Sequence, residues 1–475
     1  MPEAFTVVLD VGKSLSKLSL WSNAGALVAR ETNANRSVQG AGYLALDAKG
    51  IEEWMAGVLS EFAARAPITA IIPIAHGAAA AVLRQGSLAC AVMDYEAAIP
   101  ATVQQAYAPN RDPFAATGSP LLPVGLNVGA QLHWLEQLHP DLLSSGATIL
   151  PWPQYWAWLL CGVPASEVTS LGCHSDLWRP ASATPSELSI ARGWAQRMAP
   201  LRRAGDVLGN VSARWATRTG LPPDADVYCG LHDSNAALIA ARGFHELQSG
   251  DMTVLSTGTW FVAMRSMAPD ARIDIAALPE ERDCLVNVDV FGGLTPSARF
   301  MGGREAELLC NADTPRLDSK PDQPAFIDAA RRVIARGARA CPSFVPRVGP
   351  FAQNRGRWVN EPTDPIERGA AVSLYLALVA DTSLNLIGTC DRLLIEGRFA
   401  HCEVFVRALA ALRPREQVFV CKTPDQADVS FGALRVIDPT LRPNADLQRV
   451  LPLEVAVGAY AAQWRRDAAG IEATS

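Results

Sequence analysis

The residues best suited to chemistry near the start of the chain surround one tight turn. An apolar run ends on Asp10, a turn follows from Gly12 to Ser16, and Lys17 opens a second run in which polar and apolar residues alternate. Such runs on both sides of a short turn predict a β-hairpin. Its tip offers backbone N–H groups, hydroxyls and two ammonium groups to an anion, beside a carboxylate that can reach hydrated Mg²⁺. These groups suit the end of a nucleoside triphosphate.

The same turn also fits an ordinary surface hairpin with a solvated tip. It is not a P-loop, because a Walker loop needs a glycine five residues before Gly12, where Val7 stands. The local pattern by itself leaves the phosphate site and the plain hairpin open.

A second turn of the same design occurs in the middle of the chain. Residues 251–264 contain an apolar run, the turn Ser256-Thr-Gly-Thr and a second apolar run. A chain of 475 residues is long enough for two domains of about 200 residues or more. The repeated hairpin therefore predicts an internal duplication, with one domain over residues 1–246 and the other over residues 247–475.

Composition and charge exclude several classes of function. Hydrophobic residues make up 49% of the chain and charged residues 19%, which is typical of a globular protein. The net charge is −6, and no stretch gathers Lys and Arg with aromatic residues, so we expect no nucleic-acid partner. We expect no signal peptide and no membrane partner, because the apolar stretches are short or interrupted by proline. The ten cysteines form no CxxC pair, which favours reduced thiols and a cytoplasmic protein.

Strand-like and helix-like segments alternate along the chain. Residues 51–65 have the spacing of an amphipathic helix, residues 68–74 and 89–93 resemble strands, and residues 368–386 form a long helical pattern. This alternation predicts an α/β fold with a mixed or parallel sheet.

Two hairpins in tandem, with Asp233 after a short strand between them, resemble the actin-like ATPase superfamily. Within it the chain resembles the FGGY-family carbohydrate kinases along nearly its whole length. Three motifs carry this resemblance, namely Asp10–Lys17, Gly230–Asn235 and Ser256–Trp260. Residues 151–156, 169–178 and 296–305 are most similar to the rhizobial type of rhamnose-pathway kinase, and the Trp260 version of the second hairpin is similar to that of fuculokinases.

The resemblance implies two actin-like (ribonuclease H-like) domains around a central cleft. It implies sugar binding mainly by the N-terminal domain and binding of ATP with Mg²⁺ mainly by the C-terminal domain. The nucleotide-binding residues that it implies are Gly12, Lys13, Ser14, Lys17, Ser256, Thr257, Gly258, Thr259 and Gly397. It leaves a homodimer open.

Asp233 is the candidate general base, because phosphoryl transfer needs a carboxylate near the attacking hydroxyl. Its place after a strand and at the start of a helix also fits a plain helix cap, and both roles can coexist. Asp10 is the candidate Mg²⁺ ligand, acting through water. A turn aspartate is the alternative, which the apolar strand before it disfavours.

The resemblance also implies that residues at the ends of early strands and in later loops hydrogen-bond the sugar. The candidates are His76, Asp94, Glu96, His174, Asp176 and His232. For any one of them, an ordinary polar loop contact is the alternative.

One segment departs from the family pattern. The family carries a run of glycines after the strand that reaches the adenosine, whereas here Ile395–Phe399 keeps only Gly397. The bulkier side chains must alter how the purine and ribose are held.

The resemblance favours L-rhamnulose or L-fuculose, both 6-deoxyketoses, as the sugar. The alternatives are a kinase for xylulose, ribulose or glycerol, and a non-catalytic sugar or nucleotide sensor with the same fold.

Overall fold

A computed structural model describes residues 4–421, 423 and 427–469 of the chain. The chain divides into two compact units. Unit 1 comprises Met1–His245, Val286–Thr295 and Asp425–Asn444, and unit 2 comprises Glu246–Leu285, Pro296–Pro424 and Ala445–Ser475. The predicted domain boundary lies beside the first change of unit. The sequence pattern did not indicate that two later segments return to unit 1.

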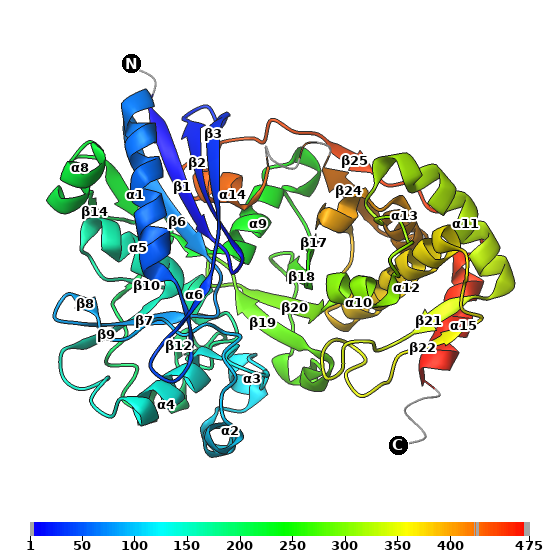
Figure 1. Cartoon of the computed structure of the whole chain (residues 1–475), viewed down its shortest axis with the longest axis horizontal. Helices are drawn as coiled ribbons and strands as arrows, with labels where there is room; N and C mark the ends of the chain where they lie inside the picture. The colour runs from blue at the N-terminus through cyan, green and yellow to red at the C-terminus, as the bar shows by residue number, and fades with distance from the viewer. Residues whose placement is uncertain (1–3, 422, 424–426, 470–475) are drawn as a thin grey trace. The chain divides into compact units, whose positions relative to one another are not determined.

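Unit 1 is built on a mixed sheet of seven strands (Figure 1). Its strands, in spatial order, are β14 (Val207–Asn210), β15 (Asp226–Tyr228), β6 (Ile68–Ala75), β1 (Phe5–Val11), β2 (Leu15–Ser22) and β3 (Leu27–Ala34), with β16 (Leu231–His232) also paired to β6. The central strand β1 runs antiparallel to β2 and parallel to β6.

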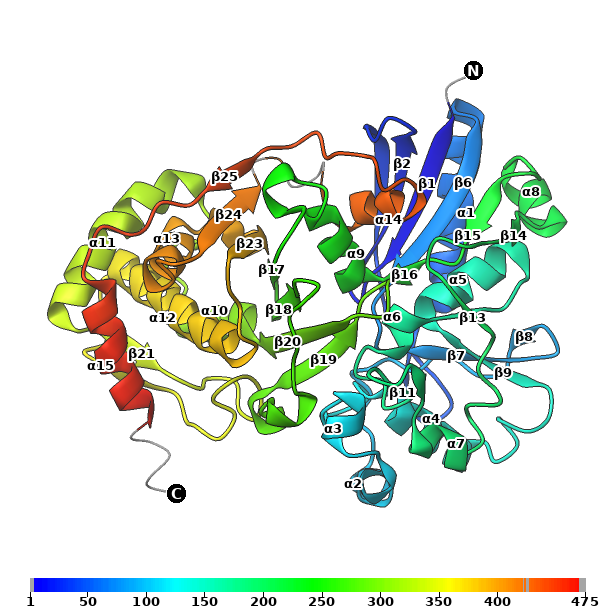
Figure 2. The same cartoon turned by 180° about the vertical axis from the view of Figure 1, so that it is seen from behind.

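Helices cover both faces of this sheet because successive residues of β1 point to opposite sides. Val7 and Leu9 pack with α1 (Ala48–Arg65) and α5 (Trp152–Cys161). Figure 2 shows these two helices beside the sheet from behind. The other face packs against α9 (Asp233–Ala241) and α14 (Val429–Ile437). The C-terminal part of the chain thus supplies a core helix to the N-terminal unit.

A second, smaller core in unit 1 surrounds a three-stranded sheet. Its strands are β8 (Ser87–Leu88), β7 (Ala80–Arg84) and β9 (Ala147–Pro151). The remaining elements of unit 1 are α2 (Ala101–Tyr107), α3 (Phe114–Thr117), α4 (Val128–Leu138), α6 (Val168–Leu171), α7 (Glu187–Ala191), α8 (Ala213–Thr219), β4 (Ser37–Gln39), β5 (Leu44–Leu46), β10 (Ser166–Glu167), β11 (Trp178–Arg179), β12 (Thr184–Pro185) and β13 (Leu201–Arg202).

The strand predicted at residues 89–93 is wrong. This segment is a loop with an isolated bridge between Met93 and Ala45, and the Val92 carbonyl accepts from the Leu46 N–H. Its apolar character reflects burial, because Val92 and Met93 are both buried in the described structure.

Unit 2 repeats the arrangement of unit 1 around its own hairpin. Its strands, in spatial order, are β19 (Cys284–Val288), β20 (Leu294–Phe300), β18 (Phe261–Ser266), β17 (Met252–Thr257), β23 (Arg392–Gly397), β24 (Gln417–Cys421) and β25 (Leu447–Arg449). The tip of the β19–β20 hairpin is assigned to unit 1. Strand β17 runs antiparallel to β18 and parallel to β23, as β1 does with β2 and β6. This shared pattern confirms the predicted duplication of an α/β unit.

The helices of unit 2 are α10 (Gly302–Leu309), α11 (Gln323–Arg336), α12 (Pro365–Leu386), α13 (Glu403–Leu412) and α15 (Val457–Ala469), and a small sheet pairs β21 (Arg339–Cys341) with β22 (Arg357–Val359). By length and composition α12 alone among the described helices could cross a membrane, but its apolar window is 83% buried inside the protein. It is the central core helix of this unit.

Candidate active site

The first hairpin places Asp10 and Lys17 opposite each other across β1 and β2. Lys17 Nζ donates to Asp10 Oδ2 over 3.2 Å. The Gly12 N–H closes the turn on the Leu15 carbonyl, and Ser14 is exposed at the tip. The predicted hairpin is therefore present, with its carboxylate at the base and its hydroxyl at the end.

Asp10 lies in an environment that favours added positive charge. The residue is buried, and burial raises the pKa of its carboxyl to about 6. Lys17 opposes that shift, while the negative charges of Asp233 and Asp428 reinforce it. Burial lowers the pKa of Lys17, but the charges of Asp10 and Asp428 more than offset it and raise the pKa above its usual value. The ammonium group of Lys17 thus interacts with two carboxylates, those of Asp10 and Asp428.

Lys13 turns away from this group toward the residues predicted to bind sugar. Its Nζ is paired with the buried Asp94 carboxylate, and lies 3.3 Å from Glu96. Burial raises the pKa of Asp94, but hydrogen bonds from Lys13, Ser37 and the Glu96 N–H lower it below its usual value. This ion pair competes with the nucleotide-binding role that is predicted for Lys13.

Asn35 holds the first hairpin from the side. Its Nδ2 donates to the Gly12 carbonyl over 2.8 Å, and its backbone N–H donates to the Ser14 carbonyl over 2.9 Å. Its Oδ1 accepts from the Ser16 hydroxyl over 2.8 Å. One residue beyond the hairpin therefore fixes three positions of the turn.

Asp233 is the first residue of α9, and His232 occupies the N-cap position. His232 Nε2 lies 3.2 Å from Asp233 Oδ1, and its Nδ1 lies 3.3 Å from Asn235 Nδ2. His232 Nε2 also lies 3.5 Å from Cys173 Sγ, and Asp233 Oδ1 accepts a hydrogen bond from the Ser234 hydroxyl over 3.1 Å. Burial lowers the pKa of His232, although the Asp233 charge opposes it. His232, predicted as a sugar contact, lies beside the candidate base.

His76 lies at the end of β6, near the same carboxylate. Its ring is buried, lies edge-on to Tyr95 at 5.4 Å, and has no hydrogen-bond partner for either nitrogen among the described residues. Burial lowers its pKa to about 4, despite the charges of Asp233 and Asp94. A neutral imidazole with both nitrogens available suits a hydroxyl-bearing ligand.

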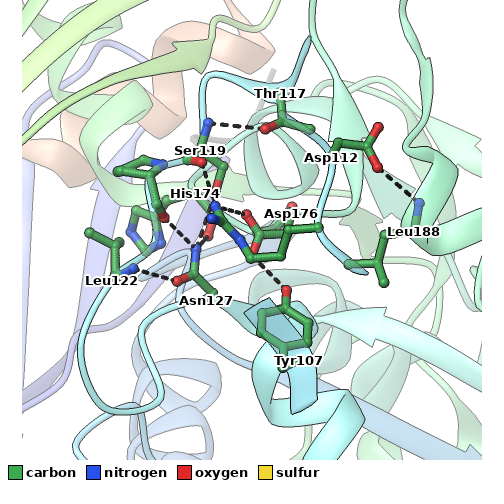
Figure 3. A network of polar contacts seen from close by, with 12 residues as sticks. Tyr107, Asp112, Thr117, Ser119, Leu122, Asn127, His174, Asp176 and Leu188 are labelled. Atoms are coloured by element: carbon green, nitrogen blue, oxygen red, sulfur yellow. Dashed lines mark hydrogen bonds and ion pairs between the residues drawn. The ribbon is translucent and has the colours of Figure 1, made fainter. Parts of the chain in front are cut away.

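Asp176 and His174 belong to a closed polar network (Figure 3). Asp176 forms two 2.9 Å hydrogen bonds with Arg111 and accepts from the Tyr107 hydroxyl over 2.5 Å. His174 Nδ1 lies 2.9 Å from the Leu126 carbonyl. The contacts that fix Asp176 are structural, and its predicted role as a sugar contact stays a prediction.

The second hairpin uses its hydroxyls internally. Thr257 is buried, donates to the Glu396 carbonyl over 2.5 Å and accepts from the Phe399 N–H over 3.0 Å. The Ser256 hydroxyl donates to the Glu396 carboxylate. Gly258 and Thr259 remain exposed at the tip. Of the four residues predicted to cradle phosphate here, these two offer a free surface.

Glycines allow the second hairpin to be braced by backbone. A Cβ on Gly303 would lie 2.2 Å from the Gly258 carbonyl oxygen, and the Gly303 N–H donates to the Thr259 carbonyl. Gly397 has a φ of +83°, and a Cβ there would lie 2.4 Å from the Thr257 carbonyl oxygen. This close approach explains why Gly397 alone persists in the altered segment Ile395–Phe399.

Sequence reasoning missed several residues of the first site. Tyr95 and Asn35 lie in loops beside the hairpin, and no spacing rule connects them to it. Asp428 forms an ion pair with Arg30 at 2.9 Å, nearly 400 positions away in the chain. A pattern read along one strand carries no signal for such partners.

Comparison with known proteins shows what the chain is similar to. Residues 249–444 match the family model described as the carbohydrate kinase FGGY C-terminal domain. A crystal structure of a carbohydrate kinase from Novosphingobium aromaticivorans superposes with a TM-score of 0.93 at 51% identity, covering 100% of both chains.

Two more distant comparisons add detail. The structure of a ligand-bound xylulose kinase from Lactobacillus acidophilus superposes with a TM-score of 0.79 at 14% identity over 99% of each chain. This likeness confirms the two-domain α/β, actin-like fold. A rhamnulokinase from Lactiplantibacillus plantarum is 30% identical over 131 residues, which is 27% of this chain and 26% of that relative. The match thus spans about a quarter of the rhamnulokinase.

Proposed function

This chain belongs to the FGGY carbohydrate kinase family, a family of ATP-dependent sugar kinases, and we propose that it transfers the γ-phosphoryl group of ATP to a hydroxyl of a neutral sugar. The observation that carries the proposal is the placement of Asp233. Its carboxylate stands at the first turn of α9, lies 3.2 Å from Nε2 of His232, and shares unit 1 with the Asp10–Lys17 pair.

Asp233 would accept the proton of the attacking sugar hydroxyl. A general base accelerates proton transfer most when it is held within hydrogen-bond reach of the hydroxyl and in one orientation. The Ser234 hydroxyl donates to one carboxylate oxygen, Oδ1, and His232 Nε2 lies 3.2 Å from the same oxygen, so the second oxygen can face the sugar hydroxyl. Lys17 would neutralise phosphate charge close by, because phosphoryl transfer depends on positioning and on electrostatic stabilisation.

The residues present also fit a magnesium ion. Mg²⁺ is commonly held by one or two carboxylates together with water and substrate phosphates, and Asp10 offers such a carboxylate in a buried, negatively charged setting. Among the described residues no three His, Cys, Asp or Glu side chains form a complete metal cage, which agrees with a site completed by phosphate. When bound, the ion supplies charge neutralisation to the triphosphate.

The charges around His76 favour a neutral sugar over a sugar acid. Two carboxylates, Asp94 and Glu96, face the single ammonium group of Lys13, and His76 is neutral at pH 7. Adding an anionic substrate there would place like charges together, which is unfavourable at short range. Ketoses and polyols carry no such charge.

Within neutral sugars we propose a 6-deoxyketose, L-rhamnulose or L-fuculose, phosphorylated in carbohydrate catabolism. The partial similarity to a rhamnulokinase supports this choice. Burying the terminal methyl group would contribute roughly 1 kcal/mol, and an unpaired hydroxyl at that position would cost about 1–3 kcal/mol. Xylulose, ribulose and glycerol are the alternative substrates. A non-catalytic sugar or nucleotide sensor is the alternative function.

A coupled assay of ADP release with L-rhamnulose, L-fuculose, D-xylulose, D-ribulose, glycerol and D-gluconate tests the proposal. We expect kcat/KM to be one to two decades higher for a 6-deoxyketose than for its 6-hydroxy analogue, and we expect no turnover of gluconate. Equal or better turnover of xylulose, ribulose or glycerol would change the proposed substrate and leave the proposed mechanism intact. Sugar binding without ADP release would favour the sensor.

The Asp233→Asn variant tests the base separately. It should keep the fold and sugar binding but lower kcat by at least about 10²-fold. A normal kcat with an unchanged melting temperature would refute the assignment. We also propose a cytoplasmic location, because ATP is the phosphoryl donor and no disulfide joins the ten cysteines, all of which lie among the described residues.

A further inference from the structure

The short segment that leads into Asp233 is held by buried side chains outside the site itself. Gln154 Nε2 donates to the carbonyl groups of Cys229 and Gly230 over 3.3 and 3.0 Å. Gly230 has a φ of +75°, and a Cβ there would lie 1.9 Å from the Pro73 carbonyl oxygen. The chain just before the base is therefore fixed on two sides by close contacts with neighbouring backbone and amide.

The last backbone donor before Asp233 meets a side-chain hydroxyl. The His232 N–H donates to Thr169 Oγ1 over 3.0 Å, and Thr169 is fully buried. Thr169 lies in α6, 63 positions earlier in the chain. This contact joins α6 directly to the residue that precedes the candidate base.

Glu167 fixes the direction of that hydroxyl. Its Oε2 accepts from Thr169 Oγ1 over 2.5 Å and from the N–H groups of Thr169 and Ser170 over 2.9 and 3.2 Å. A hydroxyl has one proton, so donation to Glu167 directs a lone pair of Thr169 toward the His232 N–H. A helix cap by itself needs only the two N–H groups.

The surroundings of Glu167 show that this arrangement is not an ordinary surface cap. The side chain is completely buried, and its Oε1 has no partner among the described residues. Burying a carboxyl group is costly, so a site that keeps one in place of a serine or asparagine cap depends on the three hydrogen bonds that its Oε2 accepts. A strong acceptor for the Thr169 proton is what the geometry shows.

We propose that Glu167 and Thr169 act as positioning residues for the phosphoryl-transfer reaction, holding the His232 backbone so that Asp233 keeps its catalytic orientation. This inference rests on the proposed function for the role of Asp233, and on the contacts above for the link from Glu167 through Thr169 to His232. Neither residue touches the sugar or the nucleotide in this scheme, so their loss should affect turnover rather than substrate binding.

Thr169→Val removes the hydroxyl at nearly constant volume, and Thr169→Ser restores it. We expect Thr169→Val to lower kcat by about tenfold to a hundredfold, because small displacements of a catalytic group have effects of this size. The KM for sugar should stay within about threefold, and Thr169→Ser should recover most of kcat. Thr219→Val is the matched control, because that buried hydroxyl in the same unit donates to the Trp215 carbonyl over 2.7 Å.

The control should lose stability and keep kcat. If Thr169→Val behaves like Thr219→Val in kcat, the positioning role is refuted. If Thr169→Val fails to fold, Glu167→Gln replaces it, since the amide keeps the shape but weakens the acceptor. An unchanged kcat in that variant would equally refute the role.

Amide hydrogen exchange at His232 gives a reading that needs no substrate. The His232 N–H should exchange faster in Thr169→Val than in the wild type and Thr169→Ser, by at least about tenfold. Unchanged protection of this N–H would refute the proposed role of Thr169 in holding the His232 backbone. If no sugar is phosphorylated by the wild type, the proposed function fails, and the exchange measurement still decides whether Thr169 holds this backbone.

Discussion

The two hairpins share one strand pattern but present different groups at their ends. The first works through side chains, with Asp10 and Lys17 paired across the strands and Asn35 clamped onto the turn. The second turns its Ser256 and Thr257 hydroxyls inward and leaves a glycine and Thr259 at the tip. One strand pattern thus presents a charged pair in the first unit and exposed backbone in the second.

The largest expected effect tests this division directly. Asp10→Asn should lower kcat/KM by about 10²–10³-fold, because a preorganised charge near transferred phosphate is lost. It should also weaken the apparent affinity for Mg²⁺. Thr259→Ala, the matched change at the tip of the second hairpin, removes one neutral hydroxyl and should cost about fivefold or less.

Steady-state kinetics at several Mg²⁺ concentrations measures both variants. Equal losses would mean that the second hairpin also acts through its side chain. A normal Mg²⁺ response in Asp10→Asn would contradict the metal assignment.

Glycine substitutions should have the opposite ranking, with a larger loss of stability in the second hairpin than in the first. Gly397→Ala forces a side chain into a positive φ and against the Thr257 carbonyl oxygen, so it should lower the free energy of unfolding by about 3–4 kcal/mol. A Cβ on Gly12 would lie 2.9 Å from the Leu15 carbonyl oxygen, so Gly12→Ala should cost about 1 kcal/mol. Denaturant unfolding distinguishes them, and equal costs would show that the second hairpin does not depend on close backbone contact.

Two buried carboxylates extend the comparison to the unit interiors. Glu305 in unit 2 spreads its hydrogen bonds over both oxygens, to Ser343, Phe344, Val345 and Tyr375. Glu167 in unit 1 concentrates them on Oε2. Burial raises the pKa of both groups, that of Glu167 to about 7.

A raised carboxyl pKa means that the folded state holds the proton more tightly than the unfolded state. The stability that comes from the protonated Glu167 is therefore present below the ordinary glutamate pKa of 4.5 and is lost as pH rises to about 7. Relative to Glu167→Gln, the wild type should lose about 3 kcal/mol over that interval. Urea unfolding of both proteins between pH 4.5 and 8 measures the difference, and a constant difference would contradict the raised pKa.

The parts of the fold that follow from local pattern were predicted well. The turn around Gly12–Ser16 is set by alternation within 20 residues, and Asp233 begins α9 where the sequence places a helix start. The strand at residues 89–93 failed because an apolar run records burial and not backbone pairing.

The parts that depend on tertiary contacts were not predictable. Lys13 stands in the phosphate motif, yet its partner is fixed by the approach of Asp94, 81 positions away. The sequence places a hydroxyl at Thr257 but does not say which way it turns. Helix α14 reaches the first unit from the end of the chain, and no periodicity indicates its destination. Residue spacing within one segment predicts helices and strands. The direction of a side chain depends on tertiary contacts with segments that are distant in the sequence.

The smallest expected effect concerns Asn35, which holds the first hairpin by side-chain contacts where the second relies on glycine. Asn35→Ala removes hydrogen bonds to the Gly12 carbonyl and the Ser16 hydroxyl, and it should lower the free energy of unfolding by about 1 kcal/mol.

Loss of this clamp frees the turn, so the KM for MgATP should rise about threefold to tenfold while kcat changes less. Asn35→Asp is the informative partner, because it keeps the acceptor for Ser16 but places a carboxylate against the Gly12 carbonyl oxygen and adds charge beside the phosphate. It should therefore raise the KM for MgATP more than Asn35→Ala does. If both variants bind MgATP normally, the first hairpin holds its shape without the clamp, and the two hairpins are braced alike by their own backbones.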